Sequence, residues 1–131
     1  MRVRISGLGN DLCRISRFRR FVEADRQALL KRIFTAEELA YAQSKTDPAP
    51  HLAVRFAAKE ALLKALGLGL RCGIRWREVA VVRNDLGRPA LVLQGRALEL
   101  FQAGGHRQIH LSCSHDGDYA LATVVLEGPG A

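Results

Sequence analysis

Two acidic residues and a lysine have the types and spacing of a site that handles phosphate. Glu60 and Lys64 stand four apart in a segment rich in helix-forming residues, so they share one helix face. Asp11 follows the first predicted strand, after Gly9. A carboxylate leaving a strand and a glutamate on a helix form the sparse oxygen set that Mg²⁺ uses beside water and phosphate. The spacing alone also fits an exposed ion pair and a helix-capping aspartate.

Other reactive side chains lack the neighbours that catalysis needs. Ser114 and His115 are adjacent in a predicted strand and point to opposite faces, which excludes a serine nucleophile with a histidine base. Cys13, Cys72 and Cys113 are odd in number and contain no C-x-x-C pair, which disfavours a zinc site and indicates reduced thiols. The chain also lacks the glycine-rich loops of nucleotide triphosphatases and dinucleotide enzymes.

Basic residues are concentrated in the first quarter of the chain. Residues 1–32 contain nine arginines and lysines against three acids, which accounts for +6 of the +7 net charge. Such a segment attracts a polyanion, and the candidates are nucleic acid, an anionic membrane surface, a phosphorylated small molecule and an acidic protein. Composition does not choose among them.

The composition is typical of one globular domain. The chain has 131 residues, of which 48% are apolar and 25% charged. Its longest apolar stretch, around residues 61–70, is interrupted by Lys64, which argues against a membrane span. No apolar export segment follows the first arginines. We therefore expect a single domain over residues 1–131 and a cytoplasmic location.

The spacing of apolar residues and the positions of capping residues and prolines predict the elements that carry these side chains. We expect a strand over residues 2–9, a helix that begins at Ser16 and runs to about residue 33, and a short helix after the capping box of Thr35 and Glu38. Residues 47–50 contain two prolines and predict a loop. The segment 51–66 is dense in Ala, Leu, Lys and Glu and predicts the helix that carries Glu60.

The second half of the chain predicts two hairpins and a helix. Strands at 78–82 and 90–93 flank a turn at Gly87, a helix covers 95–103, and strands at 109–114 and 119–126 flank an Asp-Gly turn. Strands and helices do not alternate regularly. The order therefore predicts an α+β fold, a mostly antiparallel sheet packed against helices.

Five short motifs, read in order, carry a family resemblance. They are GLGND at 7–11, RIFT at 32–35 followed by EL at 38–39, RFAAKEALLKALG at 55–67, NDLGRP at 84–89, and SCSH at 112–115 followed by DYA at 118–120. Together they resemble the holo-acyl-carrier-protein synthase family of phosphopantetheinyl transferases over nearly the whole chain. The KE-xxx-K helix paired with the early Gly-x-Asp is the specific part.

The resemblance implies a ferredoxin-like fold and a Mg²⁺-dependent reaction. The 4′-phosphopantetheine arm of coenzyme A would pass to a serine of apo-acyl carrier protein, releasing adenosine 3′,5′-bisphosphate, in fatty acid biosynthesis. It further implies that Asp11 and Glu60 hold the metal and that Lys64 contacts the phosphates. Glu60, a metal-bound water and another carboxylate all remain candidates for the base that accepts the serine proton.

The resemblance also implies binding residues and partners. The expected coenzyme contacts are Arg55, Lys59, Gly87, Arg88, Pro89 and His115. Acyl carrier proteins are acidic, so we expect docking on the basic helix at Arg14, Arg17 and Arg20. The family's usual state implies a homotrimer with active sites at subunit interfaces. Arg14 stands where the family often has a third acidic residue, so a third acidic contribution to the metal is not expected.

The alternative interpretation is a small basic nucleic-acid-binding protein. It predicts aromatic residues interleaved with the basic ones for base stacking. Only 6% of residues are aromatic, and Phe18 and Phe21 fall on the apolar face of the first predicted helix. We therefore expect neither a nucleic-acid nor a membrane partner.

Overall fold

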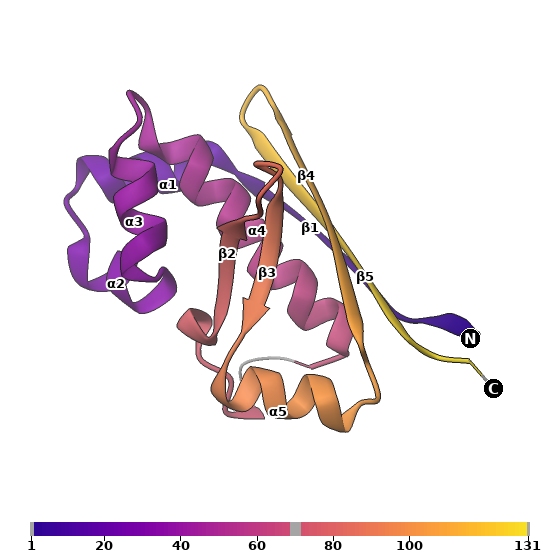
Figure 1. Cartoon of the computed structure of the whole chain (residues 1–131). Coiled ribbons are helices and arrows are strands. Elements are labelled where there is room, and N and C mark those ends of the chain that lie inside the picture. The colour runs from indigo at the N-terminus through magenta and orange to yellow at the C-terminus, as the bar shows by residue number, and fades with distance from the viewer. Residues whose placement is uncertain (1, 69–71, 131) are drawn as a thin grey trace.

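Five α-helices and two antiparallel sheets make up the part of the chain that the computed structural model describes, residues 2–68 and 72–130. In chain order they are β1 (Val3–Arg14), α1 (Ile15–Glu23), α2 (Gln27–Ile33), α3 (Ala36–Gln43), α4 (Pro48–Leu66), the short 3₁₀ helix η2 (Trp76–Glu78), β2 (Val79–Arg83), β3 (Pro89–Leu93), α5 (Gly95–Ala103), β4 (Gln108–Asp116) and β5 (Tyr119–Pro129) (Figure 1). One sheet has the order β1-β5-β4, and β2 pairs with β3. The predicted α+β class is confirmed.

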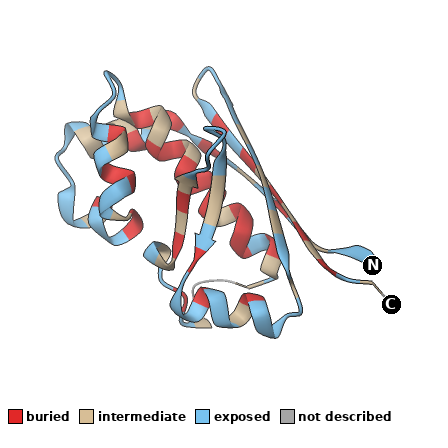
Figure 2. Ribbon diagram, viewed as in Figure 1, coloured by how far each residue is buried: buried red, intermediate tan, exposed pale blue. Residues whose placement is uncertain are grey.

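Helix α4 forms the centre of the molecule. It packs against β1 and β5 on one side and against α1, α3 and β2 on others. Alanines buried along it, among them Ala53, Ala57 and Ala61, let these elements approach closely. Figure 2 shows burial along most of its length, as expected of a helix that is apolar nearly all round. No helix in the described ranges is both long enough and apolar enough to cross a membrane.

The two faces of the three-stranded sheet differ sharply. Ala120, Ala122 and Val124 of β5 are fully buried against α4. The alternate positions leave a row of apolar side chains on what we call the outer sheet face, made of Val3, Ile5, Leu8, Leu12 and Leu121. Leu8 and Leu12 are 65% and 60% exposed. A monomer of this chain therefore presents an apolar strip to solvent.

The strand predicted at 2–9 is longer than the sequence indicated. β1 continues to Arg14, and Asp11 pairs with Ala122 within the sheet instead of following the strand's end. Gly9 does not end the strand, because it lies where β1 packs closely against α4. Asp11 thereby gains a fixed position on the inner face.

The helix predicted from Ser16 to residue 33 is two helices. Asp25 has φ 52° and turns the chain between α1 and α2, with no glycine or proline to signal it. Ser16 does not cap α1, because its N–H and hydroxyl donate to the Asp118 carboxylate at 2.8 and 2.7 Å. This contact fixes the start of α1 to the turn before β5.

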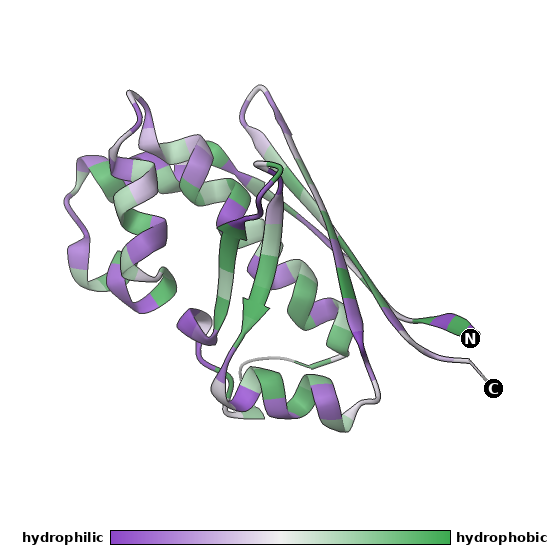
Figure 3. Ribbon diagram, viewed as in Figure 1, coloured by the Kyte–Doolittle hydropathy of each residue, from purple (hydrophilic) through white to green (hydrophobic). Residues whose placement is uncertain are grey.

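Two further boundaries show which turn signals were reliable. The loop predicted at 47–50 is wrong, because α4 begins at Pro48; a first turn leaves N–H groups unpaired, so its prolines fit there. The Thr35 and Glu38 capping box is present, and Gly87 has φ 76° in the β2–β3 hairpin. Figure 3 shows that both strands of this hairpin are largely apolar.

Candidate active site

Asp11 is placed by the two glycines that precede it on β1. A Cβ atom on Gly7 would lie 2.4 Å from the Ala65 carbonyl oxygen, and one on Gly9 would lie 2.2 Å from that of Ala61. Only glycine therefore lets β1 approach α4 this closely. The Gly-x-Gly-x-Asp pattern brings the Asp11 carboxylate to the surface of α4.

Two α4 side chains meet Asp11 at this contact. The Lys64 ammonium donates to Asp11 Oδ1 at 2.9 Å, and Glu60, one turn earlier, lines the same cavity as Asp11. Burial raises the pKa of Glu60, and the negative charge of Asp11 raises it further. Two carboxylates that repel each other in one cavity favour a bound cation.

Arginines of α1 and its start surround these carboxylates. The cavity is lined by Asp11, Leu12, Cys13, Arg14, Arg17, Arg20, Phe56 and Glu60. The Arg17 guanidinium carbon lies 5.2 Å from the Phe56 ring centroid and 5.8 Å from that of Phe21, so aromatic rings orient it. We call this the carboxylate cavity. The two carboxylates suit a divalent ion, and the three arginines around them suit an anionic ligand or partner.

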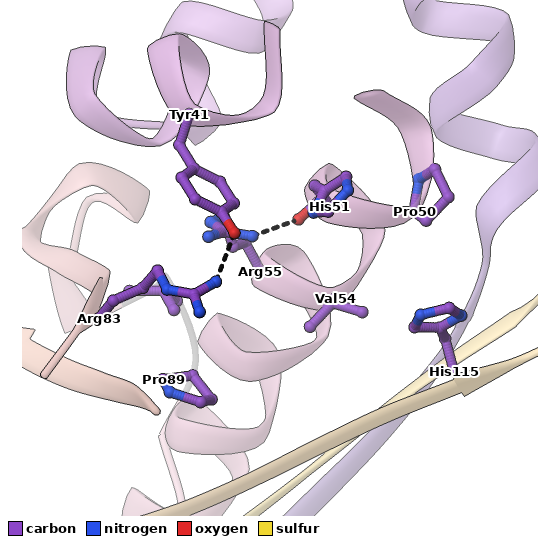
Figure 4. A pocket seen from close by; sticks show the side chains of 9 residues that line it. Tyr41, Pro50, His51, Val54, Arg55, Arg83, Pro89 and His115 are labelled. Carbon is purple, nitrogen blue, oxygen red and sulfur yellow. Dashed lines mark hydrogen bonds between the residues drawn. The ribbon is translucent and has the colours of Figure 1, made fainter. Parts of the chain in front are cut away.

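A second cavity lies around Arg55, and Figure 4 shows it from close by. It is lined by Tyr41, Pro50, His51, Val54, Arg55, Val81, Arg83, Pro89 and His115. Arg55 is only 8% exposed, and one guanidinium nitrogen donates to the His51 carbonyl oxygen at 3.1 Å. We call this the cationic cavity. Its exposed side carries His115 from β4 and Arg83 from β2.

The two cavities open on different sides of α4. Arg55 and Glu60 are five residues apart, which places them about 140° apart around the helix. Phe56, next to Arg55, belongs to the carboxylate cavity. One chain therefore presents two separate cavities, one lined by carboxylates and arginines and one by cations and aromatic rings.

A comparison of the sequence with protein-family models identifies the superfamily of this chain. A family model described as the 4′-phosphopantetheinyl transferase superfamily matches residues 7–124. The chain belongs to this superfamily. The matched residues include every side chain that lines the two cavities.

Individual members of the superfamily are similar over almost their whole length. The holo-[acyl-carrier-protein] synthase of Syntrophotalea carbinolica is 66% identical over 124 residues, covering 95% of this chain and 97% of that protein. The crystal structure of the Neisseria meningitidis holo-[acyl-carrier-protein] synthase has a TM-score of 0.84 at 34% identity, covering 94% and 98%. A Bacillus anthracis synthase in complex with CoA (3′,5′-ADP) has a TM-score of 0.77 at 31% identity, covering 95% and 97%.

Most of the residues predicted for the phosphopantetheinyl transferase site fall into these two groups. The carboxylate cavity brings together Asp11, Glu60, Arg14, Arg17 and Arg20, with Lys64 bonded to Asp11. The cationic cavity brings together Arg55, Pro89 and His115. Gly87 and Arg88 are exposed at the hairpin tip and line neither cavity.

The structure places Lys59, a predicted coenzyme contact, in the interior and outside both cavities. Its side chain is fully buried, and its ammonium lies 2.8 Å from the Glu38 carboxylate. It also donates to the carbonyl oxygens of Trp76 and Val79. All three ammonium hydrogens thus have partners inside the protein, and Lys59 joins α4 to α3 and to the start of β2.

Sequence reasoning missed three polar side chains of the cationic cavity. Tyr41, His51 and Arg83 come from α3, the first turn of α4 and the end of β2, and no spacing rule links them. A usable signal did exist for the glycines, since a Gly-x-Gly pair inside a strand indicates close backbone approach. The alternative of nucleic-acid stacking loses its support, because Phe18 is fully buried and Phe21 packs against the core.

Proposed function

We propose that this protein is a holo-[acyl-carrier-protein] synthase. It transfers the 4′-phosphopantetheine group of coenzyme A to a serine of an apo-acyl carrier protein and releases adenosine 3′,5′-bisphosphate, supplying carrier protein for fatty acid biosynthesis. The supporting observation is the cluster of Asp11, Glu60 and Lys64 in a chain 66% identical to a holo-[acyl-carrier-protein] synthase over 95% of its length. We take residues 1–131 as one transferase domain.

The carrier protein supplies the nucleophile in this reaction. Burial raises the pKa of the Cys13 thiol to about 11, with the Asp11 charge adding to it, and burial raises that of Cys113 to about 11. Both thiols are therefore protonated at neutral pH and unreactive. The three cysteines are free, which supports a reducing compartment such as the cytoplasm.

Asp11 and Glu60 are the residues that would hold Mg²⁺. Their carboxylates share one cavity and repel each other, and two carboxylates are the usual protein contribution to a Mg²⁺ site that also takes substrate phosphates. When bound, the ion neutralises charge that develops on the leaving phosphate. Side chains of this chain would orient the diphosphate, and the acyl carrier protein would supply the serine nucleophile.

The side chains around the carboxylates orient the diphosphate and stabilise its charge. The serine oxygen bonds to the phosphorus next to pantetheine, and the bond from that phosphorus to the adenosine 3′,5′-bisphosphate oxygen breaks. The serine proton passes to a base, for which Glu60 is one candidate. Lys64, whose side chain is 53% exposed, reaches the phosphates as a mobile point charge. Arg17, oriented by Phe56, adds a second cation beside the leaving group.

A direct test is the intact mass of a purified apo-acyl carrier protein after incubation with this protein, coenzyme A and MgCl₂. We expect a mass gain of one phosphopantetheine group that EDTA abolishes. No gain with several carrier proteins would overturn the proposed activity. A gain that persists in EDTA would overturn the Mg²⁺ requirement alone.

Docking of the acidic carrier protein is assigned to the arginines of the carboxylate cavity. Arg14, Arg17 and Arg20 are all exposed. We expect Arg14→Glu with Arg20→Glu to raise the KM for the carrier protein by about tenfold or more and to leave the KM for coenzyme A within about twofold. Steady-state kinetics at low and at physiological salt measure both values.

The matched control for this docking prediction reverses two arginines elsewhere. Arg2 and Arg107 are exposed and lie together at the far end of the sheet. Arg2→Glu with Arg107→Glu makes the same change in net charge and should leave both KM values near those of the wild type. Equal loss in the two double variants would show that net charge, and not this surface, drives association.

A homotrimer with active sites between subunits is the assembly we propose. The outer sheet face is exposed and apolar in the monomer, and covering it with another copy would remove that surface from water. The two cavities open on different sides of α4, so a single coenzyme reaches both kinds of residue where two chains meet. This supports a site built from the carboxylate cavity of one subunit and the cationic cavity of its neighbour.

Subunit mixing tests this arrangement. Glu60→Gln disables the carboxylate cavity and Arg55→Leu disables the cationic cavity, so each variant alone should be inactive. Random mixed trimers should recover up to about a quarter of wild-type activity, because that fraction of interfaces pairs two intact halves. Native mass spectrometry confirms mixing. Absence of recovery in confirmed mixed trimers would contradict a shared site.

A further inference from the structure

Tyr41 stands at the centre of three cations that the proposed chemistry has not used together. Its ring centroid lies 4.3 Å from the Arg55 guanidinium carbon, 4.7 Å from the Lys45 ammonium and 5.4 Å from the Arg83 guanidinium carbon. Arg83 also donates a hydrogen bond to the Tyr41 hydroxyl, as Figure 4 shows. One aromatic side chain thus contacts cations from α4, from β2 and from the segment between α3 and α4.

These cations have no carboxylate partner within residues 2–68 and 72–130. None of Arg55, Arg83 and Lys45 takes part in a salt bridge there. Arg55 is the most demanding case, because it is buried and its Nε has no hydrogen-bond acceptor among the described residues. The nearby Glu38 carboxylate is already bonded to Lys59. A buried cation with a free donor is costly to hold unless an anion arrives.

The environment of the phenol reflects the same concentration of positive charge. Burial acts to raise the pKa of Tyr41, but Arg83, Lys45 and Arg55 act against it, and the net effect is a lowered pKa. His51 packs edge-on against the ring at 5.7 Å between centroids, and its pKa is lowered by burial and then by Arg55 and Lys45. A neutral His51 at this place keeps the cavity from gaining still more charge.

We propose that Tyr41 is a positioning residue that holds Arg55, Arg83 and Lys45 together as a receptor for a phosphate group of coenzyme A. This rests on the proposed function, since coenzyme A is the phosphate-bearing substrate. The aromatic face lets three like charges stay close without a carboxylate that would compete for them. The phosphate then completes the cluster by supplying the negative charge that these three cations lack. Either the 3′-phosphate or the diphosphate of the coenzyme has this chemistry.

Two variants at Tyr41 separate the ring from its hydroxyl. Tyr41→Leu removes both, and we expect the KM for coenzyme A to rise about tenfold while kcat and the KM for the carrier protein stay within about twofold. Tyr41→Phe keeps the ring and loses only the Arg83 hydrogen bond, so its KM should rise about threefold. The matched control is Tyr119→Phe, which loses a hydroxyl from a ring that Arg14 covers at 5.1 Å. It should leave the KM for coenzyme A unchanged.

The substrate pair of coenzyme A and 3′-dephospho-coenzyme A identifies the phosphate. If the cluster binds the 3′-phosphate, Tyr41→Leu weakens coenzyme A alone; if it binds the diphosphate, both substrates weaken equally. An unchanged KM for both substrates in folded Tyr41→Leu overturns the proposal. So does an equal rise in the KM for the carrier protein, which indicates a general structural defect.

Calorimetric titration of the wild type and Tyr41→Leu with coenzyme A keeps this inference separate from the proposed function. It needs no carrier protein and no turnover. Weaker binding by the variant supports the cluster even if transfer is never seen, and equal binding refutes it even if transfer is confirmed. Thermal unfolding of each variant verifies that the folded protein is being measured.

Discussion

Glu60→Gln should lower the rate of phosphopantetheine transfer by at least about a hundredfold, because losing about 3 kcal/mol of transition-state stabilisation has that effect. Glutamine keeps the size of the side chain and removes the charge that we propose holds a divalent cation. Asp11→Asn should behave alike, since both carboxylates line one cavity. Initial rates from the intact mass of the carrier protein, at saturating coenzyme A and across a MgCl₂ series, give the measurement.

The stability of the Glu60→Gln variant should not fall. Burial and the Asp11 charge raise the pKa of Glu60, so removing this carboxylate relieves repulsion in the folded state. The matched control is Glu99→Gln on α5, whose exposed carboxylate contacts Arg96 at 3.2 Å and lies outside both cavities. It should keep full activity. Near-normal turnover of Glu60→Gln would exclude Glu60 as an essential ligand.

Several parts of this site were readable from the sequence because their causes are local. The capping box of Thr35 and Glu38 depends on residues three apart, and the Glu60 and Lys64 pair depends on one helical turn. Asp11 was singled out first as a carboxylate leaving a predicted strand and then by its place in a family motif. The physical reason for that motif, the contact of Gly7 and Gly9 with α4, appears only when the strand and helix are brought together.

Other parts depend on contacts that no local rule encodes. Because α4 is buried on nearly every side, its apolar pattern does not show which polar residue faces solvent. Lys59 and Lys64 therefore look alike in the sequence and end in opposite environments. Tyr41 and Arg83 meet although 42 positions separate them. The spacing of residues along the sequence does not reveal such a pair.

The buried Lys59 and Glu38 pair connects three elements of the fold. Glu38 Oε1 accepts the Thr35 N–H at 2.8 Å and lies 2.8 Å from the Lys59 ammonium, while Oε2 accepts the Val81 N–H at 2.7 Å. Helix α3 is thereby tied to α4 and to β2. Burial lowers the pKa of Lys59, and the Glu38 charge opposes that effect. The pair is thus held charged only while both partners are present.

Lys59→Met should lower the free energy of unfolding by about 3–5 kcal/mol, because it leaves the Glu38 carboxylate buried without its partner. Lys64→Met, five residues along the same helix, breaks an exposed pair with Asp11 and should cost only about 0.2–1 kcal/mol. Urea unfolding followed by circular dichroism measures both. The double variant Glu38→Gln with Lys59→Met removes the stranded charge and should recover part of the loss.

The activities of the two lysine variants should show the reverse order. Lys64→Met should lose transfer activity while remaining folded, because we assign its ammonium to the phosphates of the coenzyme. Lys59→Met, assayed where it is fully folded, should keep the wild-type KM for coenzyme A, because the buried ammonium is already engaged by Glu38 and two backbone carbonyls. A raised KM for coenzyme A in that folded variant would support Lys59 as a coenzyme contact. Equal stability of the two variants would show that the buried pair does not hold α3, α4 and β2 together.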